Sequence, residues 1–191
     1  IKKKIDNFNI SNITLPEDLY LPRINSSGFD FNENESIENL MKEINEFSKH
    51  TFEAYSKSIH TLAKPYAKEV ISKCSNKILG SVATCDPKSI GQNIFKPSIA
   101  WSDFEVESRY KILTSVADSI ENQRAKFSYL LMHEAGKTLE DSVDEIREAV
   151  DFLRYYAQQA IGLKSLTQRG PTGEDNVLEY CSKGIVLCIS P

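Results

Sequence analysis

Residues 141–157 read DSVDEIREAVDFLRYYA, and their apolar side chains are spaced as they would be on one face of an α-helix. The apolar positions recur at i, i+3, i+7, i+10 and i+14, which predicts a stripe that faces a core. The pattern indicates a long helix that begins at Thr138 and ends near Ile161. The members of the stripe are Val143, Ile146, Val150, Leu153 and Ala157.

Glu148 lies on the opposite face of this helix, about 160–200° away from Ile146 and Val150. Such a position usually faces water. However, Phe152 and Tyr155 follow Glu148 on the same helix face. Two interpretations therefore stay open: Glu148 is a solvated surface charge, or it lines a cavity or an interface.

Amphipathic patterns predict two more helices earlier in the chain. One covers residues 35–55, and the other runs through residues 125–135 and stops at Gly136, a residue type that often ends helices. The apolar stripe of the first helix consists of Ile37, Leu40, Met41, Ile44 and Phe47.

Two helix starts are predicted from capping signals. Ser102 and Glu105 have the spacing of a capping box, in which both side chains bond to the first free backbone N–H groups. The helix that follows carries Val106, Tyr110, Ile112, Leu113, Val116 and Ile120. Asp86 and Pro87 similarly predict the start of a short helix over residues 88–95.

About four strands are predicted, and their sheet looks incomplete. Residues 67–73 and 76–84 are β-like runs that we expect to pair as a hairpin, and residues 176–182 form a third run. Residues 184–189 are almost continuously apolar, which is typical of a parallel strand buried on both faces. Such a strand needs neighbouring strands and covering helices, and this chain does not supply enough of them.

The composition is that of an ordinary globular protein and excludes some classes of function. Of the 191 residues, 40% are hydrophobic and 26% are charged, with a net charge of −4. This charge argues against a nucleic-acid-binding surface. No apolar run approaches the roughly 20 residues that span a bilayer. The chain lacks an initiator Met and a signal-like start, so we expect a cytoplasmic piece of a longer protein.

The residues of this chain do not form a complete active site by themselves. The four cysteines contain no CxxC pair and no His at zinc spacing, so no metal site is predicted. The three histidines lie on or beside amphipathic helices and are interpreted as structural. A glycine-rich phosphate loop is also absent. The cysteines are Cys74, Cys85, Cys181 and Cys188, and the histidines are His50, His60 and His133.

Several motifs in order along the chain resemble the start of an aldehyde dehydrogenase, and most closely its glutamate-semialdehyde (1-pyrroline-5-carboxylate) dehydrogenase branch. They are W101-x8-Y110-K-I-L113, ADSIENQ at 117–123, HEAGKTLEDSVDEIREAVDFLRYYA at 133–157, GPTGEDN at 170–176 and GIVLCISP at 184–191. PEDLYLPRINSSGFDF at 16–31 resembles the junction that follows the proline dehydrogenase module in bifunctional proline utilisation A (PutA) proteins. The resemblance covers roughly residues 15–191 and departs around residues 91–101.

The resemblance implies an α/β fold, of which this chain holds the helix-rich N-terminal portion. Residues 1–33 would be a junction from an upstream module, residues 34–183 the helical part of the dehydrogenase module, and residues 184–191 the first strand of the NAD-binding domain, truncated here. Trp-Asn-Phe-Pro is expected to follow. The cysteine nucleophile, the general-base Glu and the oxyanion Asn would all lie beyond Pro191, so the chain alone is expected to be inactive.

The resemblance also implies an activity and a few site residues. The parent would oxidise L-glutamate 5-semialdehyde to L-glutamate with NAD, and FAD would belong only to the upstream proline dehydrogenase module. Ile189, Ser190 and Pro191 match the segment that lines the NAD site. Glu148 and Phe152 match the wall of the aldehyde tunnel, where a carboxylate would face the α-ammonium of the substrate.

Three further expectations accompany this interpretation. The parent is expected to be a homo-oligomer that resides in the cytoplasm or peripherally at the inner membrane. Another amino-acid semialdehyde, such as an aminoadipate semialdehyde, remains an alternative substrate. A helical interaction module without chemistry is the alternative from a different functional class.

Overall fold

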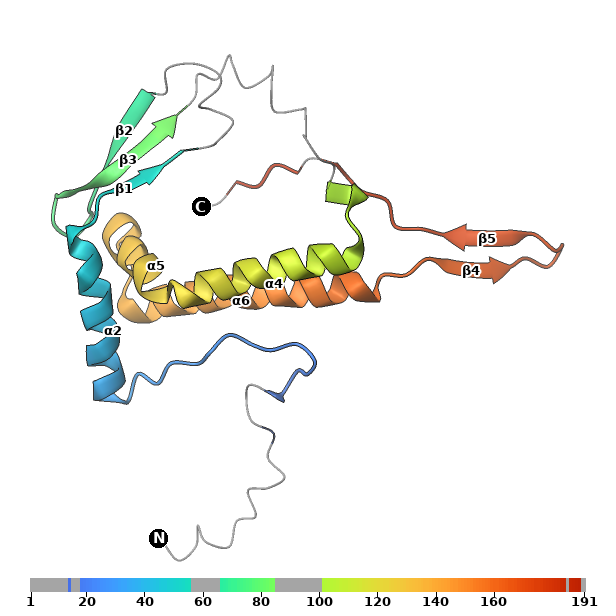
Figure 1. Cartoon of the computed structure of the whole chain (residues 1–191), viewed down its shortest axis with the longest axis horizontal. Coiled ribbons are helices and arrows are strands. Elements are labelled where there is room, and N and C mark those ends of the chain that lie inside the picture. Colours follow the sequence, from blue (N-terminus) through green and yellow to red (C-terminus); the bar gives the residue numbers. More distant parts are fainter. Residues whose placement is uncertain (1–13, 15–17, 56–65, 85–100, 185, 190–191) are drawn as a thin grey trace, which may run out of the picture.

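The computed structural model describes residues 14, 18–55, 66–84, 101–184 and 186–189. Two long antiparallel helices form its centre, α4 (Val106–Asn122) and α6 (Leu139–Gly162). They lie side by side along their length (Figure 1). The short helix η4 (Trp101–Asp103) precedes α4, and α5 (Arg124–Leu130) connects α4 to the π-helical turn η5 (Leu131–Ala135).

The apolar stripe predicted for α6 is confirmed. Val143, Val150 and Ala157 are fully buried, Ile146 is 4% exposed, and Leu153 is half-buried. On α4 the fully buried residue that faces α6 is Ala117, whose small side chain lets the two helices approach closely. Ile112 and Val116 of α4 instead lie at the surface, 40% and 44% exposed.

The predicted start of α6 at Thr138 is confirmed, whereas the cap expected for α4 is wrong. The hydroxyl of Thr138 accepts a hydrogen bond from the backbone N–H of Asp141 at 3.1 Å, which satisfies one free donor of the first turn. The helix α4 begins at Val106 with Glu105 as its N-cap and has no side-chain cap. Ser102 belongs to η4, so the segment turns once more before α4 starts.

The helix predicted over residues 35–55 is shorter than expected. It consists of α2 (Asn34–Glu46) and one 3-10 turn, η3 (Phe47–Lys49), and then the chain becomes the strand β1 (Phe52–Ala54). Leu40 and Ile44 of its stripe are buried, as the pattern predicts. The strand forms because Phe52–Ala54 find a parallel partner in a segment much later in the chain.

A three-stranded sheet covers the end of the molecule formed by α2 and α5 (Figure 1). Its order is β1-β3-β2, with β2 (Tyr66–Ile71) antiparallel to β3 (Ile78–Thr84), so the predicted hairpin is confirmed. In the parallel β1–β3 pair, Phe52 lies opposite Gly80. A Cβ atom at Gly80 would overlap the backbone carbonyl of Phe52, so only glycine fits there.

The turn between α5 and α6 is fixed by Gly136 and His133. Gly136 has φ = 77°, a left-handed conformation that ends η5, as its sequence position predicts. Nδ1 of His133 lies 3.2 Å from the hydroxyl of buried Ser72, and its ring packs 4.3 Å from that of Tyr129. These contacts support the structural interpretation of His133.

The C-terminal part differs most from the expected arrangement. Two strands, β4 (Leu166–Arg169) and β5 (Asp175–Leu178), form an antiparallel hairpin that projects from the helices (Figure 1). The described residues of the expected strand over 184–189 form no strand, and Val186, Leu187 and Ile189 are 71–86% exposed. No described strand lies beside them to accept their backbone hydrogen bonds, which explains the difference.

The other sequence expectations are met only in part. The whole is an α/β arrangement with five described strands in two separate sheets, against about four expected. Residues 18–33 contain turns and irregular chain, while the predicted helix over 88–95 lies outside the described residues. Within the part of the chain that the structure describes, no helix is both long and apolar enough to cross a bilayer.

Candidate functional site

The helix α6 presents Glu148 and Phe152 on its exposed face, opposite the buried stripe. Phe152 is 51% exposed, and its ring stacks on that of Tyr156 with 6.0 Å between centroids. Tyr156 in turn meets Tyr155 edge to face at 5.1 Å. Glu148 therefore lies one turn before a row of three aromatic rings on a single helix, which we call the aromatic row (Phe152, Tyr155 and Tyr156).

The carboxylate of Glu148 differs from its neighbours in its electrostatic surroundings. Glu145 is paired with Lys137 at 2.5 Å, and Asp144 lies 3.6 Å from Arg147. Glu148 makes no ion pair with any residue that the structure describes. Its negative charge remains accessible to a cationic group from outside this chain.

The residues expected beside NAD are Ile189, Ser190 and Pro191. No described contact joins them to Glu148 or Phe152. Ile189 is 86% exposed, and Ser190 and Pro191 lie outside the described residues. Of the three residues expected beside NAD, the structure therefore describes only Ile189, whose side chain is exposed.

A polar network that the sequence did not indicate lies beside Glu148 and Phe152. Residues 23–27, which we call the strap, run along α4 and α6 (Figure 1) and are hydrogen-bonded to both helices. Asp151 accepts hydrogen bonds from the backbone N–H of Ser26 at 2.7 Å and from its hydroxyl at 3.0 Å. Arg154 donates to the backbone carbonyl of Asn25 at 3.1 Å.

The same network continues onto α4 through Glu121. Its carboxylate accepts from the backbone N–H of Ser27 at 2.5 Å and from Arg154 at 2.7 Å. Arg154 also contacts Asp118 at 2.7 Å, and Arg124 donates to the carbonyl of Ser27 at 2.9 Å. The guanidinium of Arg154 on α6 therefore binds both the strap and two carboxylates of α4.

The electrostatics of the network favour its charged form. Burial alone would raise the pKa of Glu121, but hydrogen bonds from the N–H of Ser27 and from Arg154, with the positive charge of Arg154, lower it below its usual value. Burial likewise opposes the charge of Arg154, whereas the hydrogen bonds and charges of Asp118 and Glu121 raise the pKa of that guanidinium. Each partner therefore stabilises the other in its ionised state.

The aromatic row is also connected to the strap. The guanidinium of Arg23 lies 4.8 Å from the ring centre of Tyr20 and 5.3 Å from that of Tyr155. Such distances are typical of cation–π contacts. A chain of ring contacts consequently runs from Arg23 through Tyr155 and Tyr156 to Phe152.

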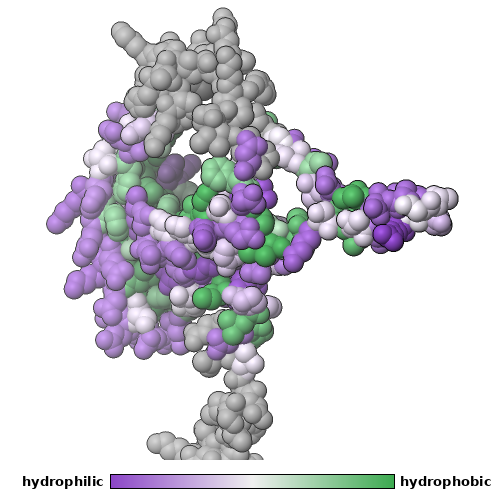
Figure 2. All heavy atoms as spheres, turned by 45° about the vertical axis from the view of Figure 1, so that its right-hand side comes forward, coloured by the Kyte–Doolittle hydropathy of each residue, from purple (hydrophilic) through white to green (hydrophobic). Residues whose placement is uncertain are grey.

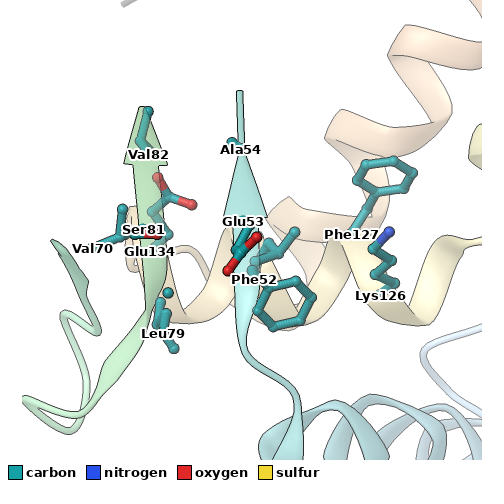
Figure 3. A pocket seen from close by; sticks show the side chains of 12 residues that line it. Phe52, Glu53, Ala54, Val70, Leu79, Ser81, Val82, Lys126, Phe127 and Glu134 are labelled. Carbon is teal, nitrogen blue, oxygen red and sulfur yellow. The ribbon is translucent and has the colours of Figure 1, made fainter. Parts of the chain in front are cut away.

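A separate pocket of about 200 Å³ lies between the three-stranded sheet and α5 (Figure 3). Its walls are mostly apolar, with Phe52 and Phe127 among them, and the carboxylates of Glu53 and Glu134 stand beside them. Neither Glu148 nor Phe152 lines it. The predicted site residues and this pocket are therefore different features.

The described cysteines give no sign of nucleophilic or metal chemistry. Cys74, Cys181 and Cys188 are exposed free thiols, and Cys85 lies outside the described residues. In the described ranges, no three His, Cys, Asp or Glu side chains are grouped as metal ligands would be. The described arrangement presents one carboxylate, that of Glu148, with no ion pair among the described residues and with aromatic rings one turn further along α6.

Sequence comparison supports the resemblance drawn from the motifs. The 1-pyrroline-5-carboxylate dehydrogenase 1 of Halalkalibacterium halodurans is 38% identical over 94 residues, which cover 48% of this chain and 18% of the relative. The bifunctional protein PutA of Klebsiella aerogenes is 30% identical over 184 residues, which cover 94% of this chain and 13% of the relative. The chain thus spans less than a fifth of the length of either protein.

Structural comparison agrees with the sequences. The crystal structure of a bifunctional proline utilization A (PutA) protein superposes with a TM-score of 0.65 and 29% identity, covering 91% of this chain and 15% of that one. The sequence profile of the aldehyde dehydrogenase family matches residues 61–191, more than half of the chain. The chain therefore belongs to the aldehyde dehydrogenase family.

Proposed function

We propose that this chain is part of an NAD-dependent dehydrogenase that oxidises L-glutamate 5-semialdehyde (1-pyrroline-5-carboxylate) to L-glutamate in proline catabolism. The observation that carries the proposal is the length of the match to PutA, which covers 94% of this chain. The family profile begins only at residue 61, so the match to PutA includes residues before it. A bifunctional parent with a proline dehydrogenase module upstream accounts for that extension.

The chemistry is divided between this chain and the remainder of the enzyme. NAD would accept the hydride, and the cysteine nucleophile and general base would come from sequence after Pro191. FAD would serve only the upstream module. This chain would contribute Glu148 and Phe152 to substrate binding, with Ile189, Ser190 and Pro191 beside NAD.

The exposed charge of Glu148 suits the substrate of this proposal. Glutamate semialdehyde carries an α-ammonium group, and a carboxylate that is not already paired can form a charge-assisted hydrogen bond with it. Phe152, one turn further along α6, would pack against the aliphatic part of the substrate. Once the rest of the enzyme covers this face, the lower dielectric would strengthen the contact.

The experiment that tests the proposal measures NADH formation by the longer enzyme with glutamate semialdehyde and NAD. We expect turnover with this substrate, and no turnover by the 191-residue chain used as a control. An aliphatic aldehyde and aminoadipate semialdehyde serve as comparison substrates. Oxidation of these two without oxidation of glutamate semialdehyde would contradict the substrate assignment, and no NADH with any aldehyde would contradict the enzyme assignment.

The assembly and location of the parent are further parts of this proposal. We expect a homo-oligomer, since the exposed apolar residues of the β4–β5 hairpin, Leu166, Val177 and Leu178, are suited to contact another protein surface. A cytoplasmic location, with peripheral attachment to the inner membrane as the alternative, would be tested by fractionating cells and assaying each fraction.

A further inference from the structure

We propose that the strap is a positioning element for the substrate-facing side of α6, with Arg23 and Asp151 as its positioning residues. The inference rests on the proposed function, because it assigns the strap a role in binding the same substrate. It also goes beyond that function, since residues 23–27 precede the part of the chain that matches the family profile.

The first step of the argument is that the strap is anchored by several independent contacts. Ser26 is 7% exposed and gives both of its donors to Asp151. Ser27 is bound through its N–H to Glu121 and through its carbonyl to Arg124. These four hydrogen bonds attach the strap to three helices, through Asp151 of α6, Glu121 of α4 and Arg124 of α5.

The second step concerns where the anchors lie on α6. Asp151 directly precedes Phe152 and follows Glu148 by three residues, which corresponds to about 4.5 Å along the helix axis. Hydrogen bonds to Asp151 therefore restrain the rotation and the axial position of the turn that carries both candidate substrate residues. Arg154, whose side chain is 11% exposed, restrains the next turn in the same way.

The third step is a direct contact between the strap and the aromatic row. Arg23 holds the ring of Tyr155, which meets Tyr156, which stacks on Phe152. Phe152 and Tyr156 are 51% and 62% exposed, so neighbouring side chains restrict their rotamers only in part. The cation–π contact of Arg23 at the far end of the row reduces the remaining freedom.

The test compares variants of the longer enzyme by steady-state kinetics with two aldehydes. Arg23→Ala removes the cation from the row, Arg23→Lys retains a cation there, and Asp151→Ala removes the acceptor for Ser26. Glu140→Ala, which removes an exposed carboxylate from the first turn of α6, is the matched control. The substrates are glutamate semialdehyde and propionaldehyde, and KM for NAD is measured for every variant.

The expected result is a larger effect on the substrate that carries an ammonium group than on propionaldehyde. KM for glutamate semialdehyde should rise about two- to fivefold in Arg23→Ala and on the order of tenfold in Asp151→Ala. Arg23→Lys should remain within about twofold of the wild type, as should Glu140→Ala. KM for propionaldehyde should rise less, because this aldehyde would contact Phe152 but has no ammonium group for Glu148, and KM for NAD should stay unchanged in all four variants.

Two kinetic results would overturn the inference. If Arg23→Ala and Asp151→Ala left KM for glutamate semialdehyde unchanged, the strap would have no positioning role. If they weakened both aldehydes and NAD equally, the strap would serve stability alone. A wild-type enzyme that oxidises propionaldehyde but not glutamate semialdehyde would overturn the proposed function itself, and this outcome is recognised before any variant is measured.

Hydrogen exchange in the 191-residue chain provides a second measurement that does not depend on catalysis. The backbone N–H groups of Ser26 and Ser27 are both donors in the network, so they should exchange slowly. Asp151→Ala should accelerate exchange at Ser26 and at the residues of α6 around Phe152. Rapid exchange at both serines in the wild type would show that the strap is not bound, which would also overturn the inference.

Discussion

Three carboxylates within two turns of α6 have three different surroundings, although their side chains are chemically alike. Glu145 is neutralised by Lys137, Asp151 accepts two hydrogen bonds from Ser26, and Glu148 is unpaired among the described residues. A carboxylate that is already paired binds a further cation less well, because its charge and acceptor sites are in use. Glu148 is consequently the carboxylate of this group that is suited to bind a cation from solution.

Replacing Glu148 should therefore affect one class of substrate. In the longer enzyme, Glu148→Ala should raise KM for glutamate semialdehyde by about 10–150-fold, because one charged contact to the ammonium group, about 1.5–3 kcal/mol, is lost. KM for an aliphatic aldehyde should change much less. Steady-state NADH formation measures KM for both substrates. The variant Glu148→Gln, which keeps the shape of the side chain but not its charge, separates the two contributions. An equal rise of KM for both substrates would show that Glu148 does not recognise the ammonium group.

Glu121 makes the stability of the strap network depend on pH. The pKa of Glu121 is lowered in the folded chain, chiefly by hydrogen bonds that outweigh burial, so folding favours its ionised form. Its contribution is fully present above the ordinary glutamate pKa of 4.5 and is lost as the pH falls through the lower, folded value. Stability should therefore decrease on acidification below about pH 4.5.

Urea unfolding of the 191-residue chain between pH 3 and pH 7 measures this dependence. Glu121→Gln should reduce the free energy of unfolding at pH 7 by about 1–2 kcal/mol, since a charged acceptor is replaced by a neutral one. The difference from wild type should shrink as the pH falls. Glu38→Gln on the exposed face of α2 is the control; a difference that persists unchanged at pH 3 would contradict the role of the Glu121 charge.

At the scale of elements, the parallel pair β1–β3 depends on one glycine. Gly80→Ala should destabilise the chain by about 3 kcal/mol or more, because the added Cβ overlaps the backbone of Phe52 and the strands must separate. Gly162→Ala is the matched control, since a Cβ there meets no atom within 4 Å at the end of α6. It should be neutral or stabilising by up to about 1 kcal/mol. Thermal unfolding distinguishes the two; equal effects would contradict the close approach of β1 to β3.

Elements with local signals could be predicted from the sequence, and those that depend on distant contacts could not. The stripe of α6, its start at Thr138 and the turn at Gly136 each arise within one or two helical turns, so the pattern determines them. The strand β1 could not be predicted, because Phe52–Ala54 become a strand only when β3 lies beside them. The helical sequence pattern continues past Phe47, but the pairing of β1 with β3 overrides it.

The candidate site shows the same division. The helical pattern places Glu148 opposite the core and beside Phe152, whereas its role in binding substrate comes from the family resemblance and stays a prediction. The network around Arg154 joins residues 33–129 positions apart, and no spacing rule reports such contacts. The one available signal was weak: Asn25, Ser26 and Ser27 are short polar residues of the kind that bond to neighbouring groups.

At the scale of the whole molecule, much apolar surface is not covered by this chain. Hydrophobic side chains are visible in the middle of the molecule and on the projecting hairpin (Figure 2). After the hairpin in the sequence, Val186, Leu187 and Ile189 are at least 71% exposed. Exposed apolar side chains of this number are suited to contact further protein.

The 191-residue chain by itself should therefore associate as its concentration rises. Light scattering during size-exclusion chromatography should give an average mass above the 21.6 kDa of a monomer at high concentration and approach it on dilution. The double substitution Val186→Asp with Leu187→Asp should shift this equilibrium toward the monomer, because two charges are placed in the apolar segment. Asn45→Asp with Ser182→Asp adds the same charge at exposed polar positions and controls for simple repulsion. If both double variants weakened association equally, the added charge and not the loss of apolar contact would explain the weakening. A monomer at every concentration would show that this surface does not drive association.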